Sequence, residues 1–136
     1  MFIRSVPLLF FVFIAYNLIV VLGGGNKPSL VLEYKLIHVP MVSGTWIITT
    51  GDTLILAILV LLFLELLKAT FSSTKTLFDH AFSMLVFVIC LVEFLLLPPA
   101  HTSIFFFIVV GSLIDVVAGY TIGIKLARRD ITIGSN

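Results

Sequence analysis

Long, nearly uninterrupted runs of apolar residues dominate the chain, and short polar segments separate them. A helix that crosses the roughly 30 Å hydrocarbon layer of a bilayer needs about 20 mainly apolar residues. Four runs have about that length, at residues 5–22, 53–70, 77–97 and 102–124. We therefore predict an all-α integral membrane protein in which residues 1–136 form a single domain, a bundle of four transmembrane helices.

Local signals mark the ends of these helices. Gly23-Gly24-Gly25 is typical of a helix stop, and no small-residue cleavage site follows the first run, so we interpret that run as a retained span and not a signal peptide. Asp52 is placed to cap the second helix, and Thr76 with Asp79 resembles a capping box at the start of the third. Pro98-Pro99 stops the third helix.

The only substantial loop covers residues 23–51. Two runs rich in β-branched and large apolar residues, Leu30–Met41 and Thr45–Thr50, flank a Gly-containing turn and predict a β-hairpin. A helix over Leu30–Ile37 is the alternative, although Pro40 disfavours it.

Two aromatic residues of this loop indicate where the hairpin lies. Trp46 and Tyr34 suit the membrane–water interface, where amphipathic rings prefer to sit. We expect a hairpin that lies on the membrane surface and covers the bundle.

The basic residues predict the orientation. With the N-terminus inside, the outer side carries only Lys27 and Lys35. The cytoplasmic side then carries Arg4, Lys68, Lys75, Lys125, Arg128 and Arg129. This asymmetry agrees with the positive-inside rule. We expect a multi-pass protein of a bacterial inner membrane, with both termini cytoplasmic and the hairpin outside.

Composition supports this class of protein and excludes others. The chain is 60% hydrophobic and 11% charged, whereas soluble domains are about 45–50% apolar and about 25% charged. A net charge of +1 gives no electrostatic footprint for nucleic acid. The lone cysteine, Cys90, lies inside an apolar run and is interpreted as a small core residue.

Ionisable residues inside spans are costly, at about 2.5–3.5 kcal/mol each on insertion scales, so each one needs a reason. Asp115 is the clearest case, because it lies near the middle of the fourth run. Gly111, Gly119 and Gly123 share its four-residue spacing, and such a stripe of small residues allows another helix to approach closely. Asp115 is then either a proton- or cation-binding carboxylate or a hydrogen-bonded clamp between helices.

Three more acidic residues extend this pattern. Glu93, Glu65 and Asp79 could form a proton or cation relay with Asp115 across the membrane. For Glu65 the alternative is a local ion pair with Lys68, three residues later.

No motif indicates enzymatic chemistry, a metal or a cofactor. His38, His80 and His101 lack the spacing of helical metal or haem ligands. We recognise no family signature and expect a non-enzyme.

The first functional hypothesis is a non-enzymatic accessory or assembly subunit of a membrane complex, which associates with a partner or with itself through the fourth helix. The second is a homo-oligomeric proton- or cation-coupled transporter or channel that uses Asp115 and Glu93. A membrane-bound enzyme or redox subunit is third.

Overall fold

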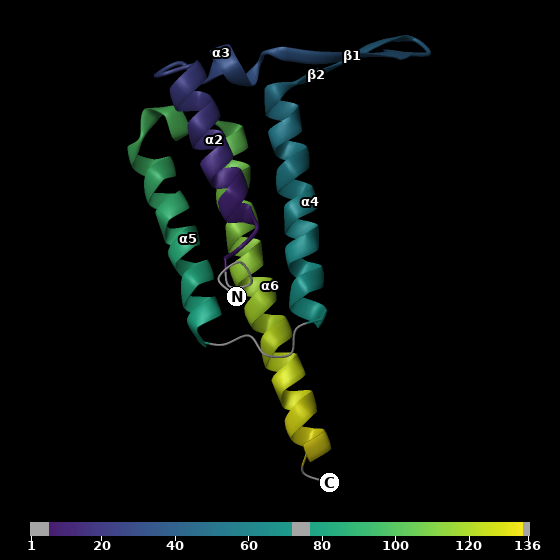
Figure 1. Cartoon of the computed structure of the whole chain (residues 1–136), viewed down its shortest axis with the longest axis vertical. Helices are drawn as coiled ribbons and strands as arrows, with labels where there is room; N and C mark the ends of the chain where they lie inside the picture. Colours follow the sequence, from purple (N-terminus) through teal and green to yellow (C-terminus); the bar gives the residue numbers. More distant parts are fainter. Residues whose placement is uncertain (1–5, 72–76, 135–136) are drawn as a thin grey trace.

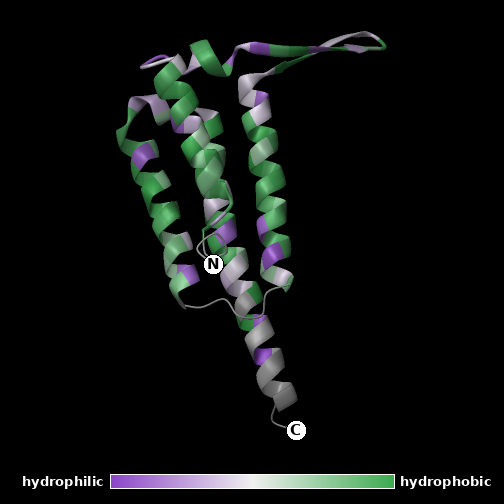
Figure 2. Ribbon diagram, in the orientation of Figure 1, coloured by the Kyte–Doolittle hydropathy of each residue, from purple (hydrophilic) through white to green (hydrophobic). Residues whose placement is uncertain are grey.

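Three helices are long and apolar enough to cross a membrane in the part of the chain that the computed structural model describes, residues 6–71 and 77–134. They are α4 (Thr50–Phe71), α5 (Leu77–Leu96) and α6 (Ser103–Gly134). Apolar residues cover most of the length of α4 and α5 and the upper part of α6 in Figure 2. The sequence prediction of a membrane-embedded helical protein agrees with this finding.

The first apolar helix is shorter than expected. The predicted span 5–22 becomes helix α2 (Leu9–Gly23), which has 15 residues and is therefore about 22 Å long. The chain before it forms a turn in which the Phe10 amide donates to the Pro7 carbonyl at 3.0 Å. Among the described residues, three helices reach the length of a span, and α2 is shorter than these three.

The glycine stop predicted after this helix is confirmed. Helix α2 ends at Gly23, and Gly25 adopts a φ of +56°, in the left-handed region that glycine enters without steric cost.

The long helices lie side by side with alternating direction, and α6 lies at the centre (Figure 1). Helix α6 contacts α2, α4 and α5, and a short 3₁₀ turn, η1 (Pro98–Ala100), follows α5 at the proline pair. The core between the helices includes the almost fully buried Tyr16, Phe105 and Ile108. Cys90 is also buried there, as the sequence predicts.

The predicted hairpin is present. Strands β1 (Lys35–Met41) and β2 (Gly44–Thr49) pair antiparallel. The extended run does not begin at Leu30, however, because a single helical turn, α3 (Ser29–Leu32), precedes the strands and buries Leu32.

The hairpin also does not cover the bundle. It leaves the upper end of the bundle at a steep angle to the helices and extends sideways beyond α4 (Figure 1). Most of its residues are exposed.

Helix α6 continues past the predicted end of the fourth span at residue 124. It runs to Gly134, beyond the ends of α4 and α5 (Figure 1). Basic residues such as Lys125 and Arg128 end the apolar run but have high helix propensity, so they do not end the helix. The capping box proposed for Thr76 lies outside the described residues, whereas Asp79 lies in the first turn of α5.

Candidate functional site

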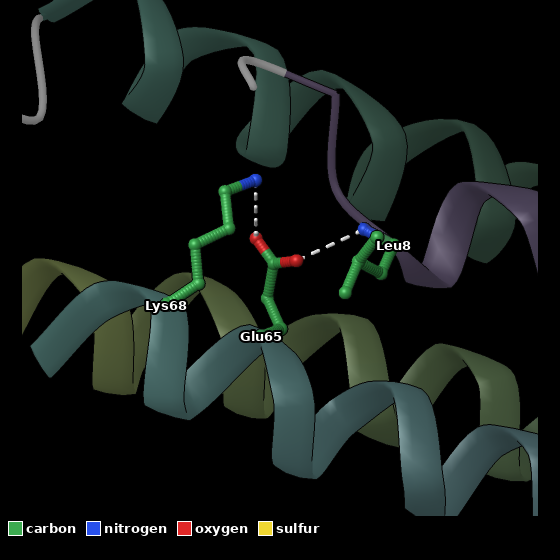
Figure 3. A network of polar contacts seen from close by, with 3 residues as sticks. All are labelled: Leu8, Glu65 and Lys68. Atoms are coloured by element: carbon green, nitrogen blue, oxygen red, sulfur yellow. Dashed lines mark hydrogen bonds and ion pairs between the residues drawn. The ribbon is translucent and has the colours of Figure 1, made fainter. Parts of the chain in front are cut away.

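Glu65 of α4 binds the start of the short helix α2. Its side chain is 2% exposed, and one carboxylate oxygen accepts a hydrogen bond from the backbone N–H of Leu8 at 3.0 Å (Figure 3). The first N–H groups of a helix have no partner within the helix, and leaving them unpaired in hydrocarbon costs free energy. A carboxylate supplies the acceptor and also complements the positive end of the helix dipole.

The second oxygen of Glu65 lies 3.8 Å from Nζ of Lys68 on the same helix (Figure 3). The local Glu65–Lys68 pair expected from the sequence is therefore confirmed. Glu65 thus holds two helices together through its contact with Leu8 and has its charge balanced on its own helix.

A second polar contact joins α2 to α5. The Asn17 side-chain amide donates to its own helix at the Phe13 carbonyl, at 3.0 Å, and to a carboxylate oxygen of Glu93 at 3.4 Å. Glu93 is partly buried. A polar residue on a membrane helix commonly makes such a contact across a helix interface.

Tyr16, near the middle of α2, provides a third contact. Its hydroxyl donates to the Pro99 carbonyl at 2.8 Å and lies 2.7 Å from the Thr102 hydroxyl. Its ring packs edge-on against Phe105, with centroids 5.1 Å apart. Helix α2 is consequently bound to α4, α5 and the start of α6 through side chains spread along its length.

Asp115 of α6 has different surroundings. The residue is 3% exposed and contributes to a partly enclosed cavity of about 400 Å³ between α5 and α6. Ser83 on the facing side of this cavity is buried as well. The rings of His80 and Tyr120 meet edge-on at the cavity with centroids 5.3 Å apart. A cavity of this size falls within the range of small-molecule sites in proteins.

The four acidic residues proposed as a relay are therefore placed in distinct settings. Glu65 contacts Leu8 and Lys68, and Glu93 contacts Asn17. Asp115 lines the cavity, and Asp79 is half-buried in the first turn of α5. The polar groups that the structure brings together around the cavity are Asp115, Ser83, His80, Tyr120 and Thr121.

The small-residue stripe of α6 is occupied by the chain's own helices where its side-chain environment is described. A methyl group added at Gly111 would lie 3.5 Å from both Ile58 of α4 and Leu9 of α2. Gly119 is buried too, whereas the surroundings of Gly123 lie outside the described part. Close helix approach along this stripe is thus observed at Gly111, within one chain.

No cluster of three or more His, Cys, Asp or Glu side chains suitable for a metal ion occurs among the described residues. His38 lies on the hairpin, and His80 and His101 lie at opposite ends of the bundle, since they belong to the start of α5 and to the turn before α6.

Sequence reasoning missed two of these contacts. The capping of α2 by Glu65 joins residues 57 positions apart, and the Tyr16 contact with Pro99 joins residues 83 apart. One available signal was Pro7, because a helix that starts near it inside the apolar region needs an acceptor for its first N–H groups.

Comparisons with protein-family models, with curated proteins and with solved structures returned no significant match for this chain.

Proposed function

We propose that this small membrane protein is a non-enzymatic accessory or assembly subunit of a membrane complex in a bacterial inner membrane. In this proposal the hairpin faces outward, both termini are cytoplasmic, and α2 lies in the fourth pass. The excess of basic residues on the proposed cytoplasmic side supports this orientation.

The observation that carries the proposal is the use of acidic side chains to assemble the bundle. Glu65 caps α2 and is paired with Lys68, and Glu93 accepts a hydrogen bond from Asn17. Burying an ionisable group within a membrane span costs free energy. For Glu65 and Glu93, contacts between helices account for their presence there. A protein whose intramembrane polar groups hold its own helices together is suited to a structural role.

The test is purification of a tagged, natively expressed copy in mild detergent, with mass and subunit composition determined together. We expect a defined set of other membrane subunits in fixed ratio. A clean homo-oligomer would contradict the proposal.

A matched pair of variants locates the partner surface. Gly123 shares the four-residue spacing of the α6 stripe, so Gly123→Leu should reduce recovery of the partners while the protein stays in the membrane. Leu113→Phe enlarges an exposed residue of α6 that lies outside both the stripe and the Asp115 cavity, and serves as the control. Equal recovery with both variants would exclude this surface.

The cavity favours a second candidate, a homo-oligomeric proton- or cation-coupled transporter or channel that uses Asp115 and Glu93. This candidate is supported by a buried acidic residue, Asp115, that lines a cavity of about 400 Å³.

In proteoliposomes, Asp115→Asn should then abolish proton or cation flux, while Asp52→Asn, at the exposed start of α4, should leave flux intact. Equal flux from the wild type, Asp115→Asn and empty liposomes would rule this candidate out.

A further inference from the structure

The pairing of the two strands sorts the hairpin side chains onto two unlike faces. Residues directly opposite each other in an antiparallel pair project to the same face, and neighbours along a strand alternate between faces. Val39 lies opposite Trp46, and Ile37 lies opposite Ile48. With Met41, these residues form a wholly apolar face; its members are Ile37, Val39, Met41, Trp46 and Ile48.

The other face is mixed and carries the polar groups. His38 pairs with Ile47, and Pro40 pairs with Thr45. Simple alternation from Ile37 would place Lys35 on the apolar face. The register shifts between Lys35 and Ile37, so that Lys35 lies opposite Thr49 instead. An extra residue in one strand has this effect, and here it moves the only lysine of the hairpin strands to the polar face.

The apolar face is exposed in the isolated chain. Trp46 is 51% exposed, Ile37 is 55% exposed and Met41 is 53% exposed. These three side chains and their neighbours make a contiguous apolar surface. Exposing such a surface to water is unfavourable in free energy.

The base of the hairpin is fixed to helix α4. The Thr49 amide donates to the Asp52 carboxylate at 3.0 Å, and the Asp52 amide donates to the Thr49 hydroxyl at 3.2 Å. This reciprocal pair is a capping box at the start of α4. The Thr50 amide also donates to the Tyr34 carbonyl at 3.0 Å, which ties the beginning of the hairpin to its end.

We propose that the hairpin is an interfacial arm whose apolar face (Ile37, Val39, Met41, Trp46 and Ile48) inserts into the boundary between lipid headgroups and acyl chains beside α4. The arm leaves the bundle at the level where the apolar helices end, which is the level of a bilayer surface (Figures 1 and 2). Strand β2 carries part of this apolar face and runs directly into the lipid-exposed helix α4 without a linker.

The division of the two faces matches a lipid boundary. An apolar face is covered by acyl chains, and Lys35, His38, Thr45 and Thr49 on the other face meet headgroups and water. Tryptophan is enriched in this zone because its ring is apolar and its N–H finds a polar partner. The inference is independent of the accessory role, since the arm would bind lipid in a transporter as well.

Trp46 is the only tryptophan in the chain and therefore reports on the arm directly. The full-length protein is reconstituted into phosphatidylcholine–phosphatidylglycerol vesicles, and Trp46 emission is recorded with lipids brominated at shallow or deep acyl positions. We expect blue-shifted emission and stronger quenching by the shallow bromines. Emission typical of water without bromolipid quenching would overturn the proposal.

Two matched variants test the assignment of the faces. Val39→Asp places a charge opposite Trp46 on the apolar face. Thr45→Asp places a charge on the polar face, at the residue that precedes Trp46 in the sequence. The first should lose most of the bromolipid quenching and shift emission to the red, and the second should retain both signals. Equal losses in the two variants would overturn the assignment.

A docked protein gives a different result. If Trp46 is shielded from both bromolipids and aqueous acrylamide in a purified complex, a protein covers the apolar face and the lipid proposal is wrong. The wild-type measurement decides the proposal even if Val39→Asp does not fold.

Discussion

Glu65 and Asp115 are both almost completely buried within apolar helices, yet their surroundings differ. Glu65 lies where α2 meets α4, and its two carboxylate oxygens contact the Leu8 N–H and the Lys68 ammonium. Asp115 lies where α5 meets α6, beside a cavity of about 400 Å³. Folding explains the first acid, because a short helix needs an acceptor for its first N–H group. The second acid differs in that it also lines a cavity.

Burial alone therefore does not distinguish an acid that joins two helices from an acid that lines a cavity. What separates the two sites is the volume next to the carboxyl. The following predictions test whether this distinction holds, beginning with the largest expected change in stability.

Glu65→Leu should lower the free energy of unfolding by about 2–3 kcal/mol, because it leaves the partly buried Leu8 N–H without its acceptor and removes the partner of Lys68. Glu65→Gln keeps an acceptor oxygen and should cost about 1 kcal/mol or less. Unfolding by denaturing detergent in mixed micelles measures both. A loss of the same size in the two variants would mean that the charge matters and the cap does not.

The packed contact of α6 with α2 and α4 and the cavity between α5 and α6 should also differ in their tolerance of added side-chain volume. Gly111→Leu should cost about 1–3 kcal/mol, since even a methyl group at Gly111 would already contact Leu9 and Ile58. Ala81→Leu adds volume beside the Asp115 cavity and should be nearly neutral. Gly111→Ala is the internal control and should be tolerated, because its added carbon lies at an ordinary contact distance of 3.5 Å. Destabilisation by Ala81→Leu equal to that of Gly111→Leu would show that the cavity is not available space.

Tyr16→Phe should have a smaller effect, about 0.6 kcal/mol, typical of a single hydrogen bond between membrane helices. The variant removes the hydroxyl contacts with Pro99 and Thr102 but keeps the ring packed on Phe105. The same unfolding assay applies. No measurable change would show that ring packing alone holds α2 against the turn between α5 and α6.

Asp115→Asn should change stability least, because the amide fills the same volume and still forms hydrogen bonds. The distinguishing property of Asp115 should be its chemical reactivity toward a carboxyl-modifying reagent. A lipophilic carbodiimide should modify Asp115 in preference to Glu65 in the wild type, because Asp115 lines a cavity whereas both oxygens of Glu65 contact other groups. Peptide mass spectrometry locates the adduct. Modification mainly at Glu65 would reverse the comparison between the two sites.

The helices could be predicted closely from the sequence, because apolar run length and helix-stop residues act locally. Gly23-Gly24-Gly25 and Pro98-Pro99 end helices where expected. The hairpin followed from composition around Val42-Ser43-Gly44. The register shift near Lys35 did not, since strand pairing depends on the partner strand as well as on the local pattern.

The candidate site could be predicted only in part. Charge in an apolar run singles out Glu65, Glu93 and Asp115, and a spacing of three residues gives the Glu65–Lys68 pair. The partners Leu8, Asn17 and the Asp115 cavity arise from the packing of helices that lie far apart in the sequence. One-dimensional periodicity shows which side of a helix is polar but not which neighbour that side meets.

The length of α6 has a mechanical consequence. Its 32 residues span about 48 Å, some 18 Å more than the hydrocarbon thickness of a bilayer. A single continuous helix resists bending, so the shorter segment beyond α4 and α5 moves together with the longer part of α6 that packs against three other helices. Any sideways force on the projecting end would become a tilt at the level of Asp115, and any change of packing around the cavity would become a displacement at that end.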